Sequence, residues 1–277
     1  MPEGGFVAGI LAGLFGLLIG SFLNVCIHRW PEEQSVVTPR SRCPGCGHPI
    51  AWYDNIPVLS WILLRARCRH CGGAIHWRYP LVELLTAACF FWFAAHHGLT
   101  LEALKYCLFA AMLIGLLFSD LETLLLPDQF TIGGFLLGLA FAPFVPVPDS
   151  SFRFAASLAG YTPGPQTASL GEALLGGILP SGALWLTGWL FQKLRHKEGL
   201  GFGDVKMIAM VGAFLGLRGT LLTIILGSVA GSVIGLIYIK ATRRDPGEFQ
   251  LPFGAFLGAA ALSVALSGQA WYWALFG

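Results

Sequence analysis

Four acidic side chains stand at the ends of long apolar segments, and they are the first candidates for chemistry. They are Asp120, Glu122, Asp128 and Asp204. The first three lie in the segment LLFSDLETLLLPD, and Asp204 follows a glycine cluster in GLGFGDVKM. A carboxylate inside or at the edge of a membrane span is energetically costly, so its position points to a function. If the helices that carry Asp120 and Asp204 pack together, these two carboxylates face each other.

A facing pair of carboxylates has the chemistry of an aspartic protease. The ionised member takes a proton from water, while the protonated member donates one to the scissile carbonyl oxygen. Because such a pair titrates as a unit, the acid and base roles are not assigned to separate residues. Gly201 and Gly203 suit this site, since glycine permits tight backbone geometry and the close approach of a substrate strand.

Each carboxylate also has a purely structural interpretation. Asp128 follows Pro127 and precedes an apolar run, a pattern that favours a helix N-cap. Asp204 could cap its own helix in the same way, and Glu122 could be a solvated interfacial residue. The sequence gives no distance between Asp120 and Asp204, so these alternatives stay open.

Four of the seven cysteines form two C-x-x-C pairs with 21 residues between them. They are Cys43, Cys46, Cys68 and Cys71. Two such pairs supply a closed tetrahedral set of four sulfurs, which suits a structural zinc ion. The alternatives are redox dithiols or disulfides, and a cytosolic location disfavours stable disulfides. The other three cysteines, Cys26, Cys89 and Cys107, lie in apolar segments and are interpreted as small buried hydrophobes.

The composition indicates the elements that must position these groups. Of 277 residues, 55% are hydrophobic and 12% charged, against about 25% charged in soluble domains. The sequence therefore predicts an all-α, polytopic membrane protein with about eight transmembrane helices and a small zinc-ribbon-like insert. The predicted spans are 6–27, 80–97, 100–119, 129–147, 172–193, 204–217, 220–239 and 252–275. The predicted domains are a first transmembrane helix at 1–27, a metal-binding insert at 28–79 and a helical protease domain at 80–277.

The charge distribution predicts the orientation of these spans. The first span is not expected to be a cleaved signal peptide, because an acid precedes it and its basic residue, Arg29, follows it. With the N-terminus outside, 14 of the 17 Lys and Arg residues fall on or beside cytoplasmic segments, as the positive-inside rule requires. The cysteine insert and all four acids then lie at the cytoplasmic face. The Pro-, Gly- and Ser-rich stretch 143–171 is expected to be an irregular outer loop.

Several segments together resemble the type IV prepilin peptidase family, also called leader peptidase and N-methyltransferase, whose members are GxGD-type intramembrane aspartyl proteases. The resemblance covers nearly the whole chain. It rests on GSFLNVCIHRWP at 20–31, the paired C-x-x-C block at 41–87, SDLETLLLPD at 119–128, KEGLGFGDVKMIAMVGAFLG at 197–216 and QLPFGAFLGAAA at 250–261. GxGD alone is a weak signal, but GxGD after the upstream segment DLETLLLPD and paired C-x-x-C motifs is a specific one.

The resemblance implies that Asp120 and Asp204 are catalytic, with Gly201, Gly203, Pro127 and Asp128 as supporting motif residues. It implies a bacterial inner-membrane enzyme that removes basic leaders from type IV prepilins and type II secretion pseudopilins at a Gly–Phe junction. It also implies N-methylation of the new terminus with S-adenosylmethionine. The expected partners are these substrates and the lipid bilayer, with no nucleic acid, and no oligomeric state is predicted.

The methyltransferase half has little support from the residues themselves. No strand–GxGxxG–helix unit appears, so the cofactor site is unconventional. Near the cysteine insert, Glu83, Asn55 and Arg78 are polar residues that could serve, although structural roles are also open to them. Two rival functions remain: another GxGD protease of the presenilin or signal peptide peptidase sort, and a non-enzymatic zinc-stapled membrane scaffold or transporter.

Overall fold

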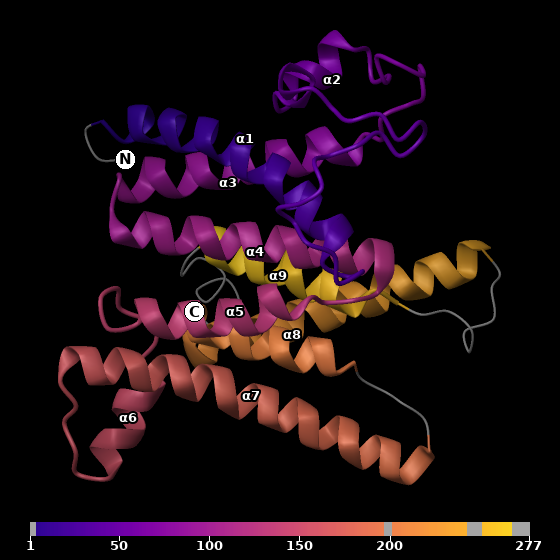
Figure 1. Cartoon of the computed structure of the whole chain (residues 1–277). Coiled ribbons are helices and arrows are strands. Elements are labelled where there is room, and N and C mark those ends of the chain that lie inside the picture. Colours follow the sequence, from indigo (N-terminus) through magenta and orange to yellow (C-terminus); the bar gives the residue numbers. More distant parts are fainter. Residues whose placement is uncertain (1–3, 197–200, 243–250, 268–277) are drawn as a thin grey trace. The chain divides into compact units, whose positions relative to one another are not determined.

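The regular structure of the chain is helical throughout the part that is described. The computed structural model describes residues 4–196, 201–242 and 251–267 (Figure 1). Over these ranges no strand forms, and the only β pairing consists of two isolated bridges in the insert. The predicted all-α class is therefore confirmed. The helices are α1 (Gly5–Arg29), η1 (Trp52–Asn55), α2 (Leu59–Leu63), α3 (Arg78–His97), α4 (Leu101–Thr123), α5 (Asp128–Phe141), α6 (Ser151–Leu158), α7 (Pro165–Arg195), α8 (Phe202–Thr242) and α9 (Phe253–Ser267).

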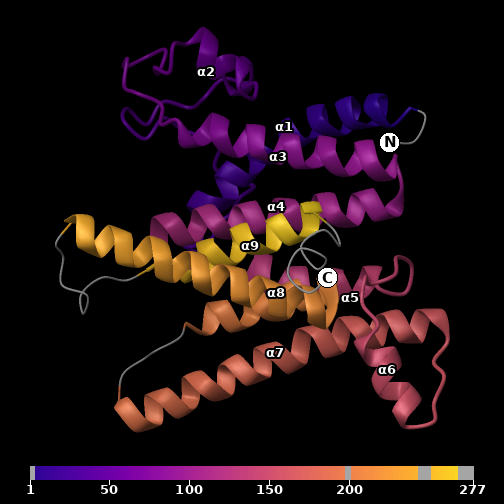
Figure 2. The same cartoon turned by 180° about the vertical axis from the view of Figure 1, so that it is seen from behind.

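Five of the described helices are long and apolar enough to cross a membrane, namely α1, α3, α4, α7 and α8. The apolar helices α5 and α9 are shorter, with 14 and 15 residues. The 41-residue α8 is broken at Gly216, whose φ of 73° and ψ of −175° are not helical. Figures 1 and 2 show α8 turning back on itself there. With α8 counted as two segments, each of the eight predicted spans overlaps an apolar helix, and residues 268–275 of the last predicted span lie outside the described residues.

The chain divides into two compact units, Met1–Gly115 and Leu116–Gly277. The division falls inside α4, so α4 contributes to both units. The cysteine insert belongs to the first unit, and Asp120 and Asp204 belong to the second. The domain scheme predicted from the sequence, with boundaries at 27 and 79, stays a prediction.

Glycines let the two membrane helices of the first unit pack closely. A Cβ atom at Gly20 of α1 would lie 2.6 Å from the Cα atom of Glu83, and one at Gly16 would lie 2.8 Å from the Cα atom of Ala87, both on α3. Small residues at such contacts let helix backbones approach closely in a membrane. Large apolar side chains on α1 remain exposed, including Phe6, Leu14 and Leu18, as expected for a lipid-facing surface.

Glycines also let α7 pack closely against α8 in the second unit. Gly176 of α7 faces the break in α8, where an added Cβ atom would lie 2.7 Å from the Cα atom of Gly216. Gly212 lies one turn earlier on α8, and a Cβ atom there would collide with the backbone of Gly176 and Gly177. The first segment of α8, which begins beside Asp204, is therefore fixed against α7 by backbone contact.

Replacing Gly212 with Ala should destabilise the second unit, because the rigid backbone of α7 cannot yield to the added methyl group. We expect a cost of roughly 1–3 kcal/mol, seen as a lower midpoint of thermal unfolding in detergent. Gly182→Ala is the matched control, since Gly182 lies on α7 with no neighbour near its Cβ position. That control should be neutral or slightly stabilising. Equal unfolding midpoints for the two variants would show that this packing does not govern stability.

The stretch 143–171 is more ordered than its composition predicts. It contains α6, and α7 begins at Pro165 within it, seven residues before the predicted span at 172. The physical reason is long-range: carboxylates at positions 149 and 172 accept hydrogen bonds from the first backbone N–H groups of α6. Local Pro, Gly and Ser content cannot indicate such contacts.

Candidate functional site

Asp120 lies in the last turn of α4 and is held by the start of α9. Its Oδ2 atom accepts a hydrogen bond of 2.7 Å from the backbone N–H of Ala255, in the first turn of α9. The neighbouring Gly254 leaves room for this contact, since a Cβ atom there would lie 3.1 Å from the same Oδ2. Asp120 is only 5% exposed. A helix N-terminus is a natural site for a carboxylate, and here it fixes the position of Asp120.

Asp204 lies in the first turn of α8 and is also buried, at 9% exposure. Its backbone N–H donates to the carbonyl oxygen of Gly201 at 3.2 Å. A Cβ atom at Gly201 would lie 3.2 Å from Oδ2 of Asp204, so the carboxylate folds back over this glycine. Asp204 follows two helical residues, so it is not the N-cap that one structural interpretation of the sequence expected.

Leu126 connects the surroundings of the two carboxylates. A Cβ atom at Gly203, next to Asp204, would lie 3.1 Å from Cβ of Leu126. A Cβ atom at Gly254, next to Asp120, would lie 2.9 Å from Cδ1 of the same leucine. The two carboxyl groups are close enough to interact electrostatically. The structure therefore brings Asp120 and Asp204 together, although 83 residues separate them in the sequence.

Asp128 has a different role from the expected N-cap. The residue before α5 is Pro127, and no side chain caps this helix. Asp128 instead forms an ion pair with Lys206 near the start of α8. The capping interpretation is wrong because a cation from a distant segment lies within reach, and this contact ties the start of α5 to the start of α8. Glu122 is an exposed residue in the last turn of α4.

Two residues near the carboxylates were missed by sequence reasoning: Leu126, and Ala255 through its backbone N–H. Leu126 lies in a turn where Leu124 has a positive φ of 56° and Ser119 Oγ donates to the carbonyl oxygen of Leu125 at 2.9 Å. Ala255 follows the Pro252-Phe-Gly sequence that opens α9. The Pro and Gly at the start of α9 are a signal that a helix begins there. They do not indicate that the N–H of Ala255 bonds to Asp120.

The four paired cysteines form one cluster in the first unit. The Sγ atoms of Cys43, Cys46, Cys68 and Cys71 all lie within 4.8 Å of one another. Those of Cys43 and Cys71 are 3.8 Å apart. In a tetrahedral site with Zn–S bonds of about 2.3 Å, sulfurs stand about 3.8 Å apart, so this geometry fits a metal. Cys26, Cys89 and Cys107 are buried in helices, as expected.

The cluster is built from two turns of the same design. Cys43 N–H donates to the carbonyl oxygen of His48, and Cys68 N–H donates to that of Gly73. Gly47 and Gly72 follow the second cysteine of each pair and have φ values of 70° and 69°, a conformation that favours glycine. The segments CPGCGHPI and CRHCGGAI thus form an internal repeat that is visible in the sequence itself.

The thiols of this cluster differ in their pKa values. Backbone N–H groups of Cys71 and then His70 lower the pKa of the Cys68 thiol to about 6. For Cys46 the backbone N–H of His48 acts in the same direction, but desolvation and the neighbouring thiols of Cys43 and Cys71 together raise its pKa to about 11. Hydrogen bonds from Arg69 lower the pKa of Asp54, and the guanidinium Nη2 lies 2.6 Å from Oδ1 of Asp54. This pair connects the second turn to η1.

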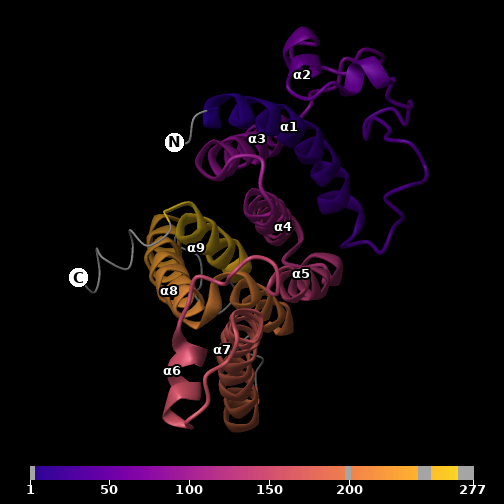
Figure 3. The same ribbon diagram turned by 90° about the vertical axis from the view of Figure 1, so that its left-hand side faces the viewer.

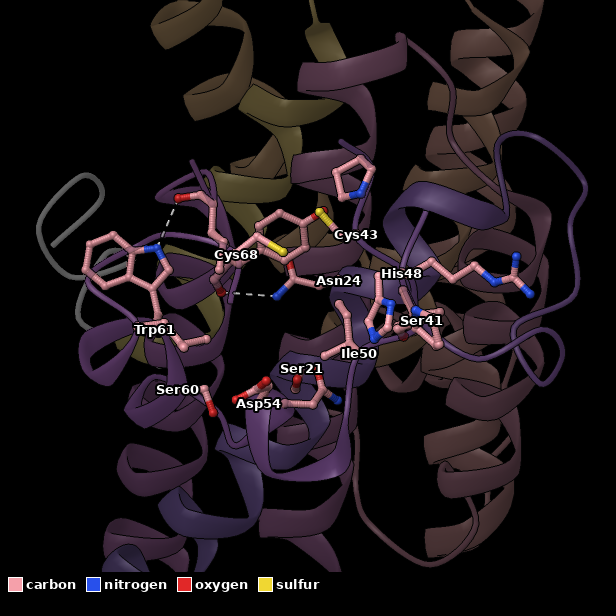
Figure 4. Close-up of a pocket in the computed structure, with 18 of the residues that line it drawn as sticks. Ser21, Asn24, Ser41, Cys43, His48, Ile50, Asp54, Ser60, Trp61 and Cys68 are labelled. Carbon is pink, nitrogen blue, oxygen red and sulfur yellow. Dashed lines mark hydrogen bonds between the residues drawn. The ribbon is translucent and has the colours of Figure 1, made fainter. Parts of the chain in front are cut away.

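A cavity of about 580 Å³ lies in the first unit beside the cysteine cluster. Its lining includes Cys43, Asp54, Asn55 and Glu83. In Figure 4 the side chain of Asn24 projects into the space between Trp61 and His48, and a dashed line marks its bond to the backbone of Tyr79. Of the three polar residues named from the sequence, Glu83 and Asn55 line this cavity and Arg78 does not.

The cavity holds polar groups that are buried. Asn24 is 4% exposed, and its Oδ1 atom accepts no hydrogen bond from the described residues. Glu83 is 7% exposed, and its Oε2 accepts the N–H of Val58 at 2.7 Å. Cavities of roughly 300–1,000 Å³ with a few convergent polar groups are typical ligand sites.

Comparisons with known proteins place the chain in a family. The model of the bacterial peptidase A24 N-terminal domain matches residues 14–97, and that of the type IV leader peptidase family matches residues 107–236. Similar curated proteins are each called a prepilin leader peptidase/N-methyltransferase. One from Myxococcus xanthus is 43% identical over 83% of this chain, which spans 63% of that relative's length.

Two further relatives match over most of both chains. One from Aeromonas salmonicida is 36% identical, over 95% of this chain and 92% of its own length. One from Pseudomonas aeruginosa is 34% identical, over 92% and 89%. No solved structure matches the chain. These matches agree with a membrane fold that carries both the paired carboxylates and the cysteine cluster. The chain therefore belongs to the type IV leader peptidase family.

Proposed function

We propose that this chain is a membrane-embedded aspartic endopeptidase that removes the short basic leader from type IV prepilins and type II secretion pseudopilins. The observation that carries the proposal is the buried pair Asp120 and Asp204, which two different membrane helices bring together around Leu126. The names given to the relatives support the same activity.

In the proposed mechanism the two carboxyl groups activate one water molecule. The ionised carboxylate takes a proton from the water, whose oxygen attacks the scissile carbonyl carbon, while the protonated carboxyl donates a proton to the carbonyl oxygen. Collapse of the tetrahedral intermediate then breaks the C–N bond, and the leaving nitrogen takes a proton. The N–H of Ala255 holds one oxygen of Asp120 in place, so the carboxyl group is oriented before the substrate arrives.

The proposed substrate suits the position of the pair along the chain. Asp204 lies where an apolar helix begins, and the positive-inside pattern assigns that end to the cytoplasm. A prepilin leader is basic and its following segment is an apolar helix, so the leader stays cytoplasmic while the helix enters the bilayer. The Gly–Phe junction between them then lies at the level of the carboxylates, at the inner face of the bacterial inner membrane.

The test is cleavage of a purified prepilin by the full chain reconstituted in lipid, followed by intact-mass measurement of the product. We expect loss of the leader at the Gly–Phe junction and no cut within the apolar helix. A prepilin with Gly replaced by a bulky residue at the junction is the matched control and should stay intact. Cleavage within the helix would favour a protease of the presenilin sort, and an intact leader with folded enzyme would overturn the proposal.

We further propose that the cavity of the first unit binds S-adenosylmethionine for methylation of the new N-terminus. The donor set fits this group: the acceptor atoms of Asn24 and Glu83 are buried, and the ligand carries amino and hydroxyl donors next to a positively charged sulfur. When bound, the cofactor would supply an activated methyl group. Glu83 and Asn24 would hold it, and the apolar walls would exclude water.

Binding of S-adenosylmethionine to the purified full chain, measured by isothermal titration calorimetry, tests this assignment without requiring catalysis. Glu83→Gln keeps the shape but removes the charge, so we expect the affinity to fall roughly tenfold or more. Glu32→Gln is the matched control, since Glu32 is exposed in the same unit and does not line the cavity. Unchanged affinity in Glu83→Gln would place the cofactor elsewhere.

We also propose that the cysteine cluster holds one structural zinc ion through four thiolates. The support is the spacing of the four sulfurs, which suits tetrahedral coordination. A closed set of four sulfurs leaves no position for water or substrate, which is the arrangement of a structural site. The zinc would fix the two turns whose residues also line the cavity.

A further inference from the structure

Helix α6 has only eight residues, yet its N-terminus is secured by two buried carboxylates. The side chain of Asp149 has no exposed area, and its Oδ1 accepts the N–H of Ser151 at 3.1 Å. Glu172 of α7 is fully buried and accepts the N–H groups of Phe152 at 2.8 Å and Arg153 at 3.0 Å. Three of the first free N–H groups of α6 therefore have partners. A helix this short is unstable alone, so these contacts fix it in place.

The other end of α6 is closed by a Schellman motif. Tyr161 N–H donates to the carbonyl oxygen of Ala156, and Gly160 N–H donates to that of Ser157. Gly160 has the positive φ of 72° that this motif requires. The ring of Phe152 packs against α7 at Gly171, where an added Cβ atom would collide with it. Helix α6 is thus a rigid attachment to α7.

This rigid helix presents apolar side chains away from the protein. Phe154 is 66% exposed and Leu158 is 76% exposed, and their spacing of four residues places them on one face. Tyr161, 54% exposed, continues this stripe just beyond the helix. The opposite side carries Ala156, which is buried. We call the exposed residues Phe154, Leu158 and Tyr161 the α6 stripe.

The contacts of α6 place it at the end of two membrane segments. Glu172 marks the start of the span predicted at 172–193, and Oδ2 of Asp149 accepts the N–H of Arg218, just after the break in α8. The same side chain packs against Gly216 at that break. Figures 1 and 2 show α6 running across the direction of α7, and Figure 3 shows the two helices next to each other. A helix at the ends of two spans and across their direction lies parallel to the membrane surface.

We propose that α6 is an interfacial helix that lies in the outer lipid–water boundary, with the α6 stripe inserted among the phospholipids. Short amphipathic helices bind at this boundary with their apolar face in the acyl region, and tyrosine is enriched at that depth. Arg153 is exposed one position before Phe154, where it can reach lipid phosphates. The proposal rests on the multi-pass placement of the chain and not on its peptidase activity.

The test is photocrosslinking of the full chain in phosphatidylethanolamine and phosphatidylglycerol vesicles. The photoreactive residue p-benzoylphenylalanine replaces Phe154 or Leu158, and mass spectrometry of the irradiated protein identifies the adduct. Ala159 is the matched control: it is exposed, but at 100° per residue it lies about 140° around the helix from Phe154. We expect phospholipid adducts at 154 and 158 at several times the yield at 159.

Equal lipid yields at 154 and 159 would overturn the proposal, and so would an adduct to a second protein chain at 154. All three positions are exposed, so the substitutions leave the core intact, and size-exclusion chromatography verifies this before irradiation. The readout does not involve leader cleavage. An inactive enzyme with lipid adducts at 154 would therefore refute the peptidase function and leave the interfacial helix standing.

Discussion

Replacing either Asp120 or Asp204 with Asn should reduce prepilin cleavage by about 10²–10⁴-fold while the protein stays folded. Asn keeps the size of each side chain, and at position 120 it can still accept a hydrogen bond from the N–H of Ala255. It can neither take a proton from water nor share one with the other carboxyl group. Initial rates of leader removal by the reconstituted variants measure the effect, and thermal unfolding in detergent verifies the fold.

The double variant shows whether the two carboxyl groups act as one catalytic pair or contribute independently. If Asp120 and Asp204 act as one unit, the double variant should cleave no more slowly than either single variant, because the first substitution already stops the reaction. Asp128→Asn is the matched control, since Asp128 is 57% exposed and engaged with Lys206. Full activity in Asp120→Asn or Asp204→Asn, with loss of activity in Asp128→Asn, would contradict the proposed pair and assign a catalytic role to Asp128.

Replacing Cys68 with Ser should abolish metal binding by the insert and unfold it locally. A cluster of four thiolates contributes about 10–16 kcal/mol on binding zinc in small peptides, and an insert with so little core depends on that energy. Metal analysis of protein purified without chelators should give about one zinc per wild-type chain and almost none for the variant. Limited proteolysis should then cut between residues 40 and 75 much faster than in the wild type.

Cys107→Ala is the control for this experiment, because Cys107 is a buried thiol outside the cluster. Its metal content and protease resistance should match the wild type. A wild-type chain without zinc, or a Cys68→Ser variant with a full complement of zinc, would contradict the structural metal site. Treatment of the wild type with a strong chelator should reproduce the effect of the substitution, and added zinc should reverse it.

The membrane helices and the cysteine cluster were predictable because their signals are local. Apolar runs of helical length indicate spans whatever their neighbours are, and two C-x-x-C pairs indicate a shared ligand set. Even the break in α8 at Gly216 falls at the end of the span predicted at 204–217, just before the span predicted at 220–239. These local signals do not indicate that the two cysteine turns have the same backbone conformation.

Features that depend on distant partners could not be predicted. Asp128 has the local sequence of an N-cap, yet it pairs with Lys206 from another helix. Helix α6 lies in a stretch with the composition of a loop, and it forms because Asp149 and Glu172 satisfy its first N–H groups. The N–H of Ala255 beside Asp120 is a backbone group, which no side-chain pattern indicates. In each case the deciding partner lies outside the local sequence.

The short helices beside the carboxylate pair have a consequence for the lipid around them. At 1.5 Å per residue, α5 and the segment 202–215 of α8 are each about 21 Å long, against about 30 Å for the hydrocarbon core of a bilayer. The hydrophobic mismatch is about 9 Å, and a membrane meets it by thinning or by drawing headgroups and water inward. Either response would bring water to Asp120 and Asp204 and shorten the lipid path of an arriving substrate helix. We therefore expect the rate of leader removal to depend on acyl-chain length.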